Sequence, residues 1–212
     1  ADDDSVATKD LTAEARALAS QVAMRWAPGD LTAYFGGGSE RDVLDNRPCQ
    51  ALVVILKTRG CTWALAGGCT MCGYANESAW TKVGEEELVA QFERAWKKYN
   101  NEELVKIYTS GSFLDRFEVM QGAQKRILSI IGKTPKKVAF ESLPGFVTDE
   151  ALTALDGICT KLEIGIGVES ANLLVLRDSI NKGHSFDAFP IAAAPCKRHT
   201  VSVQSYLNCN PT

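Results

Sequence analysis

The chain has 212 residues, of which 45% are hydrophobic, and its formal net charge at pH 7 is −3. This length and composition predict one large globular domain with its own core, and no apolar run approaches the ~20 residues that span a bilayer. The acidic start has neither the basic nor the apolar region of a signal peptide, so we expect a cytoplasmic protein whose seven cysteines are thiols or metal ligands. The negative charge gives no overall attraction to nucleic acids.

The first part of the chain is predicted to hold a tail, one helix and a loop. Apolar side chains recur at helical spacing between residues 10 and 27, and Pro28 and Gly29 end that pattern. The segment 36–48 is rich in glycine and charge, which is typical of a loop. We therefore divide the chain into residues 1–48, packing on the core, and a core over residues 49–212.

Strand and helix patterns alternate through the core. Short apolar, β-branched runs predict five strands, at 51–56, 104–109, 138–142, 162–169 and 200–207. Helical patterns lie between them, near 84–99, 116–131, 148–158 (capped by Thr148), after Ser170, and from a cap at Ser185 onward. Such alternation indicates a parallel sheet whose chemistry gathers at the C-terminal strand ends. If the sheet curves into a partial (β/α) barrel, these ends form one site.

Three of the seven cysteines follow the first predicted core strand with the spacing C-x7-C-x2-C: Cys61, Cys69 and Cys72. Clustered thiolates select zinc or an iron–sulfur cluster. A structural zinc normally takes four protein ligands, and no fourth cysteine or histidine lies close in the sequence. The residues therefore favour a [4Fe–4S] cluster with one open iron, and the alternative is zinc with a remote fourth ligand.

This loop resembles that of the radical S-adenosylmethionine (radical SAM) superfamily. The residues Arg59-Gly60-Cys61 and Gly68-Cys69-Thr70-Met71-Cys72-Gly73-Tyr74 are similar to one branch of it, the radical SAM subunit of archaeosine synthase. That branch is related to the elongator-type tRNA-modifying radical enzymes. The resemblance covers roughly residues 50–207. It implies a TIM-like partial barrel, of whose usual six strands this sequence carries five, with Cys61, Cys69 and Cys72 as ligands of a [4Fe–4S] cluster.

The resemblance also implies which residues bind S-adenosylmethionine: Ser110, Gly111, Ser112, Glu141, Ser142, Glu169, Lys182 and Tyr74. The Ser-Gly-Ser turn would hold the ammonium group and Lys182 the carboxylate. Alternatives remain for several of them. The turn is also a common strand-to-helix connection, Glu169 could instead pair with Lys182 or Arg177, and Asp115 could face substrate or cap a helix.

The activity implied is reductive cleavage of S-adenosylmethionine to a 5′-deoxyadenosyl radical that attacks tRNA. The substrate would carry a lysine-modified 7-deazaguanine at position fifteen, and cleavage of the lysine C–N bond would give archaeosine. The lysine-transferring archaeosine synthase subunit would be the partner and supply the tRNA surface. The alternatives are another radical SAM RNA-modifying enzyme and a non-enzymatic zinc or iron–sulfur module.

The basic residues considered for RNA binding are scattered, at 97–98, 133, 136–137 and 197–198. Most of them lie near helix ends or loops, away from the predicted C-terminal ends of the strands. Because phosphate neutralisation dominates affinity for nucleic acids, we expect this chain alone to bind tRNA only weakly.

Overall fold

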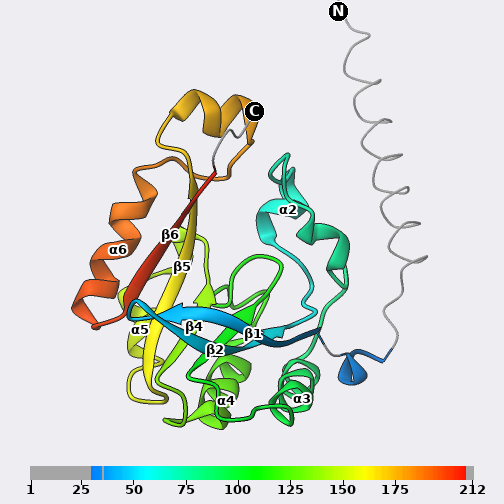
Figure 1. Ribbon diagram of the computed structural model, residues 1–212. Coiled ribbons are helices and arrows are strands. Elements are labelled where there is room, and N and C mark those ends of the chain that lie inside the picture. Colours follow the sequence, from blue (N-terminus) through cyan, green and yellow to red (C-terminus); the bar gives the residue numbers. More distant parts are fainter. Residues whose placement is uncertain (1–29, 35, 209–212) are drawn as a thin grey trace, which may run out of the picture.

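One six-stranded sheet organises the chain (Figure 1). The computed structural model describes residues 30–34 and 36–208, so the helix expected between residues 10 and 27 lies outside the described part. The strands follow one another in space as in sequence: β1 (Gly36–Leu44), β2 (Arg47–Ile55), β3 (Leu104–Tyr108), β4 (Lys137–Glu141), β5 (Lys161–Glu169) and β6 (Ser202–Leu207).

The five predicted strands are confirmed as β2 to β6, and each pairs in parallel with the next. Their C-terminal ends therefore meet at one edge of the sheet, as the pattern of polar strand ends predicts. Strands β1 and β6 form the two outer edges. The described sheet is consequently open, and no closed barrel is formed by the residues that the structure describes.

The segment 36–48, predicted to be a loop, instead forms β1 and a tight turn into β2, with which β1 pairs antiparallel. The two turn residues, Asp45 and Asn46, have φ values of 51° and 61°. Positive φ at both central positions is the geometry of a two-residue hairpin turn, and Asp and Asn tolerate it better than most residues. The charged residues of β1 are accommodated because it is an edge strand.

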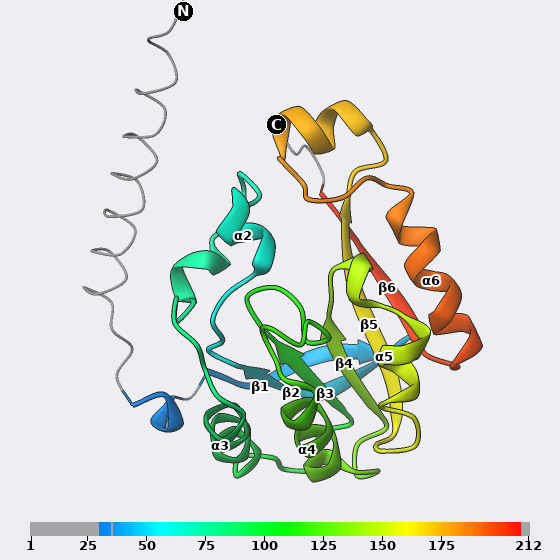
Figure 2. The ribbon, with the colours of Figure 1, turned by 180° about the vertical axis from the view of Figure 1, so that it is seen from behind.

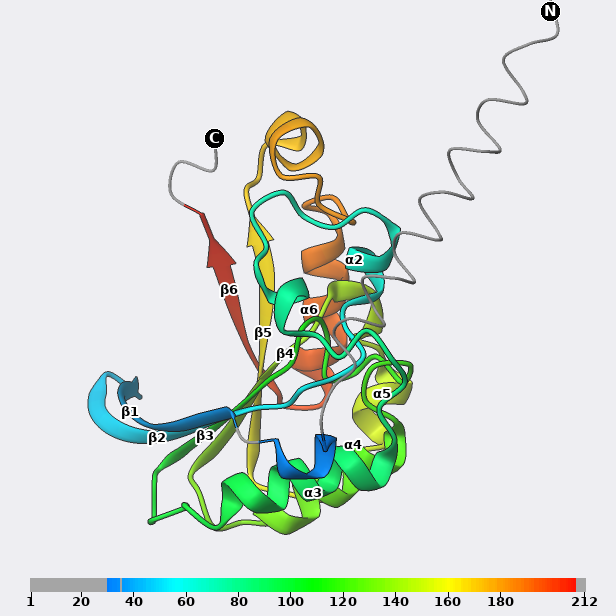
Figure 3. The same cartoon turned by 90° about the vertical axis from the view of Figure 1, so that its right-hand side faces the viewer.

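Four helices cover one face of the sheet (Figures 2 and 3). These are α3 (Glu85–Trp96), α4 (Gln121–Ile131), α5 (Asp149–Thr153) and α6 (Ala188–Arg198). The shorter elements are α2 (Thr62–Ala66), three 3₁₀ turns, η1 (Leu31–Ala33), η2 (Tyr74–Glu77) and η3 (Pro144–Phe146), and one π turn, η4 (Val175–Ser179). No helix within the described residues combines the length and the apolar character needed to cross a membrane.

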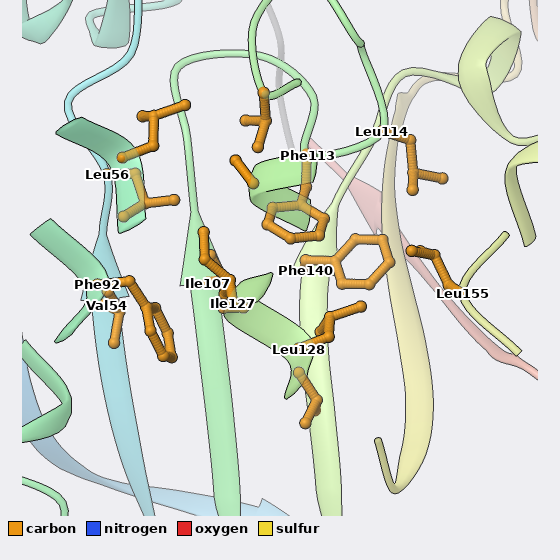
Figure 4. Packing of buried hydrophobic residues seen from close by; sticks show 14 of the residues in the cluster. Val54, Leu56, Phe92, Ile107, Phe113, Leu114, Ile127, Leu128, Phe140 and Leu155 are labelled. Carbon is orange, nitrogen blue, oxygen red and sulfur yellow. The ribbon is translucent and has the colours of Figure 1, made fainter. Parts of the chain in front are cut away.

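The core lies between the sheet and these helices (Figure 4). Alternate strand residues such as Ile107 and Phe140 point toward the helices, where they meet Phe92, Ile127 and Leu128. The rings of Phe113 and Phe140 lie 4.7 Å apart between centroids. Because side chains alternate along a strand, the residues between these core positions face the opposite side of the sheet. No helix among the described residues covers that second face (Figure 3).

The helix predicted over 116–131 begins later, at Gln121. Residues 115–119 form a turn first, in which the backbone N–H of Val119 donates to the carbonyl of Asp115 at 2.7 Å. Phe117 lies in this turn, before the helix, and is 75% exposed. The apolar spacing of the segment is genuine, but a side-chain turn at Asp115 displaces the helix start.

Two other helix predictions need smaller corrections. Thr148 caps α5 as predicted, because its hydroxyl oxygen accepts from the N–H of Ala151 at 3.1 Å. That helix ends at Thr153 and not near residue 158. The predicted cap at Ser185 is wrong, since α6 begins at Ala188 after a separate turn.

Candidate functional site

The cysteine loop, residues 59–74, leaves the C-terminal end of β2 and carries all three candidate metal ligands. Cys61 is the residue before α2, and Gly67, with φ of 155°, ends that short helix. Cys69 and Cys72 follow on the descending part of the loop. Cys61 and Cys69 are half-buried and Cys72 is exposed. Figure 1 shows α2 at the top of the molecule, across from the segment that follows β5.

The cysteine loop is fastened to a second loop, residues 179–184, which we call the Asn181 loop. The indole N–H of Trp63 donates to the carbonyl of Asn181 at 2.8 Å, and the Asn181 amide donates back to the carbonyl of Gly68 at 2.8 Å. The N–H of Thr70 donates to the carbonyl of Ile180 at 2.8 Å. These bonds join segments far apart in sequence and fix the conformation of the loop that carries the cysteines.

On its other side, the cysteine loop touches the Ser110–Ser112 turn at the end of β3. Just after the loop and η2, the hydroxyl of Ser78 donates to the Ser110 hydroxyl oxygen at 2.9 Å. A Cβ atom added to Gly111 would lie 2.8 Å from Cα of Cys61, so the two backbones are in direct contact. The structure thus brings the predicted glycine-rich turn against the first cysteine.

Burial and neighbouring thiols affect the pKa values of Cys61 and Cys69. Burial raises the pKa of Cys69, Lys182 opposes that rise, and Cys72 and Cys61 add to it. Burial also raises the pKa of Cys61, while hydrogen bonds from the backbone of Ala64 oppose the rise. Even so, no group of three or more Cys, His, Asp or Glu side chains is gathered into a metal-holding arrangement among the described residues. The cysteine loop therefore carries all three thiols on one segment, but does not arrange them around a position for a metal ion.

A buried ion pair lies beside Cys69. The ammonium of Lys182 is 2.9 Å from the Glu169 carboxylate, and the two side chains are only 7% and 10% exposed. This is the ion-pair alternative predicted for Glu169, whose φ is 63°. Nearby, Nε2 of His184 is buried with no hydrogen-bond partner among the described residues. An unpaired buried nitrogen is costly unless something binds it, so this position can accept a ligand.

Glu141 and Ser142, at the end of β4, have different surroundings: Glu141 lines a cleft, and Ser142 is buried. Glu141 lines a cleft of about 370 Å³ on the open face of the sheet, together with Lys106, Tyr108 and Tyr206. Burial raises the pKa of the Glu141 carboxyl, and the hydroxyl of Tyr206, hydrogen-bonded to it, opposes the rise. The Ser142 side chain is buried and donates to the carbonyl of the next residue at 3.1 Å.

Two further candidates, Tyr74 and Asp115, lie on or against the cysteine loop. Tyr74, at the start of η2, is 65% exposed. Asp115 is almost fully buried and accepts from the hydroxyl of Thr62 at 2.6 Å and from the N–H of Phe117 at 2.9 Å. Asp115 was expected either to face substrate or to cap a helix. Its contacts favour a structural role, since it stabilises a local turn and binds Thr62 of the cysteine loop.

Comparison with known proteins relates these features to one group. No protein-family model matches the chain. Over 176 residues the chain is 40% identical to archaeosine synthase subunit beta of Methanosarcina acetivorans, an alignment that covers 80% of this chain and 51% of that protein. The chain is similar to archaeosine synthase subunit beta. This result confirms the link to archaeosine synthase that the cysteine loop predicts.

Two further relatives align over a similar length of the chain. Archaeosine synthase subunit beta of Thermococcus kodakarensis is 32% identical over 181 residues, which cover 82% of this chain and 56% of that protein. An uncharacterized protein of Methanocaldococcus jannaschii is 34% identical over 171 residues, covering 76% and 47%. The chain therefore spans about half the length of the curated relatives that it matches.

Glu118 is the residue at this site that sequence reasoning missed. Its carboxylate, 1% exposed, accepts from the Thr58 hydroxyl at 2.6 Å and from the N–H groups of Gly111 and Ser112 at 3.0 and 2.7 Å. Burial raises the pKa of this carboxyl, and its bond from Thr58 opposes the rise. Through these bonds to the N–H groups of Gly111 and Ser112, Glu118 fixes the backbone conformation of the Ser110–Ser112 turn. The available signal was an acidic residue set among apolar neighbours shortly after that turn.

Because Gly111 touches Cys61, the substitution Gly111→Ala is expected to destabilise the protein by about 1–3 kcal/mol, as overpacking does. The new methyl group would lie 2.8 Å from Cys61 and 2.7 Å from the Glu118 carboxylate, and neither is a freely movable side-chain end. The free energy of unfolding from urea titration measures the effect. Gly145→Ala is the control, because nothing lies within 4 Å of its added Cβ. Equal stability of the two variants would contradict the contact.

Proposed function

We propose that this chain carries the cluster- and cofactor-binding part of a radical SAM enzyme that forms archaeosine in tRNA. The observation that carries the proposal is its 40% identity to archaeosine synthase subunit beta over a region that contains three cysteines spaced C-x7-C-x2-C. The proposed architecture is the partial radical SAM barrel, of which the described open sheet would form one side. The shared region covers about half of the relatives, so the activity of the whole protein is part of the proposal.

The proposed ligands of a [4Fe–4S] cluster are Cys61, Cys69 and Cys72. Thiolates are the usual donors to iron–sulfur clusters, and three of them on one loop leave one iron open. The unpaired, buried Nε2 of His184 lies near the same Lys182 and Glu169 that influence Cys69, which supports a bound group in this region. When bound, such a cluster supplies the electron for reductive cleavage of S-adenosylmethionine, which starts hydrogen abstraction from the substrate.

The chain's own residues would bind and orient S-adenosylmethionine at the C-terminal strand ends. The Ser110–Ser112 turn, held in place by Glu118, would offer backbone carbonyls and the Ser110 hydroxyl to the methionine ammonium. The Ser112 hydroxyl is buried and accepts from the N–H of Leu143 at 2.7 Å, so Ser112 would contribute through its backbone. Lys182 is the cation available to the carboxylate, and Glu169 holds its position. The remaining proposed contacts are Glu141 and Ser142, at the end of β4, and Tyr74, on the surface of the cysteine loop.

The proposed substrate is tRNA that carries the lysine-modified 7-deazaguanine, and the proposed reaction is cleavage of the lysine C–N bond. The proposed partner is the subunit that attaches the lysine. The decisive experiment incubates the anaerobically reconstituted protein with a reductant, S-adenosylmethionine and lysine-modified tRNA. Mass analysis of the tRNA nucleosides should show archaeosine, and release of 5′-deoxyadenosine should accompany it. A protein that binds the cluster but releases no 5′-deoxyadenosine when given S-adenosylmethionine, reductant and lysine-modified tRNA would contradict the proposal.

If Glu141 contacts the cofactor, Glu141→Ala should weaken binding of S-adenosylmethionine by about tenfold, the loss of one hydrogen bond to a charged group. Equilibrium dialysis with the cluster-loaded protein measures this affinity. Glu163→Ala is the matched control, because Glu163 lines the same cleft nearer the N-terminal strand ends and pairs with Lys137 at 2.9 Å. Unchanged affinity in the Glu141 variant, or an equal loss in both, would exclude the proposed contact.

A further inference from the structure

A groove beside the cysteine loop combines exposed aromatic rings with cations. Its volume is about 380 Å³, and the residues that matter for its chemistry are Arg59, Lys82, Arg116, Trp80 and Phe117. The cations come from three separate segments of the chain, just before Cys61, just before α3 and just before α4. Because these cations are far apart in the sequence, no single basic stretch contains them, whereas the fold brings them together.

The groove is positively charged. Its lining contains three cationic side chains and no carboxylate. Within the described residues, Arg59 and Lys82 take part in no ion pair. Arg116 pairs with Glu150 at 2.8 Å, but both side chains are exposed, and such pairs contribute little. The groove therefore attracts an anion in spite of the chain's net charge of −3.

The two aromatic residues of the groove are exposed to solvent, and Trp80 has an unusual backbone conformation. Phe117 is 75% exposed, and Trp80 is 36% exposed with a φ of 54°. A bulky residue rarely adopts positive φ, and such conformations collect at functional sites. The residues before Trp80 explain how it is held, because Ser78 and Ala79 are buried and the N–H of Ala79 donates to the carbonyl of Thr58 at 2.8 Å.

We propose that this groove binds a single-stranded segment of the substrate RNA, with phosphates on the cations and bases stacked on Trp80 and Phe117. Proteins recognise unpaired RNA by stacking bases on aromatic rings and by placing cations on the backbone. Charge complementarity favours RNA over an apolar partner protein. The inference rests on the proposed function, in which RNA is the substrate, and it places the RNA next to the cysteine loop. It also replaces the expectation that recognition lies wholly outside this chain.

The test is equilibrium binding of a fluorescently labelled, unmodified tRNA transcript to the full chain, measured by anisotropy at several salt concentrations. Phe117→Ala and Trp80→Ala should each weaken binding about tenfold, within the range for one lost stacked base, and leave the salt dependence unchanged. The slope of log K against log salt is negative, and Arg59→Gln and Lys82→Gln should each make it less steep by about 0.7, the loss of one phosphate contact. Trp80→Gly is the second variant at that position, since glycine adopts positive φ without strain and keeps the fold.

Two controls match these changes on α6, away from the groove. Ile191→Ala removes an apolar side chain that is 73% exposed, and Lys197→Gln removes an exposed charge. Both should bind the transcript as the unchanged chain does. The proposal is overturned if the unchanged chain shows no binding, if the groove variants bind as tightly as it does, or if the controls lose as much affinity. It is also overturned if the groove variants bind RNA normally but lose a partner subunit.

A separate measurement distinguishes failure of this inference from failure of the proposed function. Iron content and release of 5′-deoxyadenosine without RNA report on the cluster and cofactor alone. Phe117→Ala should leave both unchanged. If the chain cleaves S-adenosylmethionine but its groove variants still bind RNA fully, only the groove assignment is wrong. If no cluster forms but the groove variants lose RNA binding, the groove stands and the proposed chemistry is wrong.

Discussion

Replacement of any one of Cys61, Cys69 and Cys72 by alanine is expected to abolish binding of the proposed iron–sulfur cluster. The three thiols sit on one loop, and that loop is held by the Asn181 loop on one side and by the Ser110–Ser112 turn on the other. A cluster with three protein ligands has no spare donor, so loss of one thiolate should remove it. Iron and sulfide content per chain after anaerobic reconstitution measures the outcome.

The control is Cys159→Ala, which removes a thiol of another kind. Cys159 is buried near the N-terminal end of β5, and burial raises its pKa to about 11. It lies at the N-terminal strand ends, the edge of the sheet opposite the cysteine loop, and so is not placed to bind a cluster held by that loop. This variant should keep its full iron content. Full iron in any one of the three loop variants would show that the cysteine loop does not bind the cluster.

The parallel part of the sheet was predictable because its residues carry a strong signal. Each of the strands β2 to β5 buries apolar side chains on its helix-covered face, such as Val54, Ile107 and Ile164, so the corresponding segments read as short apolar runs. The edge strand β1 gives no such signal, since its residues are largely glycine or charged. Only the Asp45-Asn46 pair, which suits a tight turn, pointed to the hairpin.

The candidate site was predictable where residues close in sequence act together, and not where distant segments meet. The cysteine spacing and the Ser110–Ser112 turn are local patterns. The contacts of Glu118 with Thr58 and the clustering of Arg59, Lys82 and Arg116 arise only from the approach of separate segments. The pairing of Glu169 with Lys182 was among the alternatives, because a buried carboxylate requires a partner.

That buried pair leads to a second expectation of large effect. Lys182→Met should destabilise the protein by about 3–5 kcal/mol, because it leaves the Glu169 carboxylate buried without its cation. The pair is 2.9 Å apart, and both side chains are at most 10% exposed. The double variant Glu169→Gln with Lys182→Met removes both charges and should recover much of the loss. The free energy of unfolding from urea titration, with the m-value, measures each variant.

An exposed ion pair provides the matched control. Arg198 lies 2.6 Å from Asp149, and their side chains are 57% and 55% exposed. Because water screens such a pair, Arg198→Met should leave the free energy of unfolding almost unchanged. If Lys182→Met costs as little as this, the Glu169 carboxylate must reach water or another donor once Lys182 is gone. A loss that persists in the double variant would instead mean that the methylene stem of Lys182, and not its charge, stabilises the Asn181 loop against the cysteine loop.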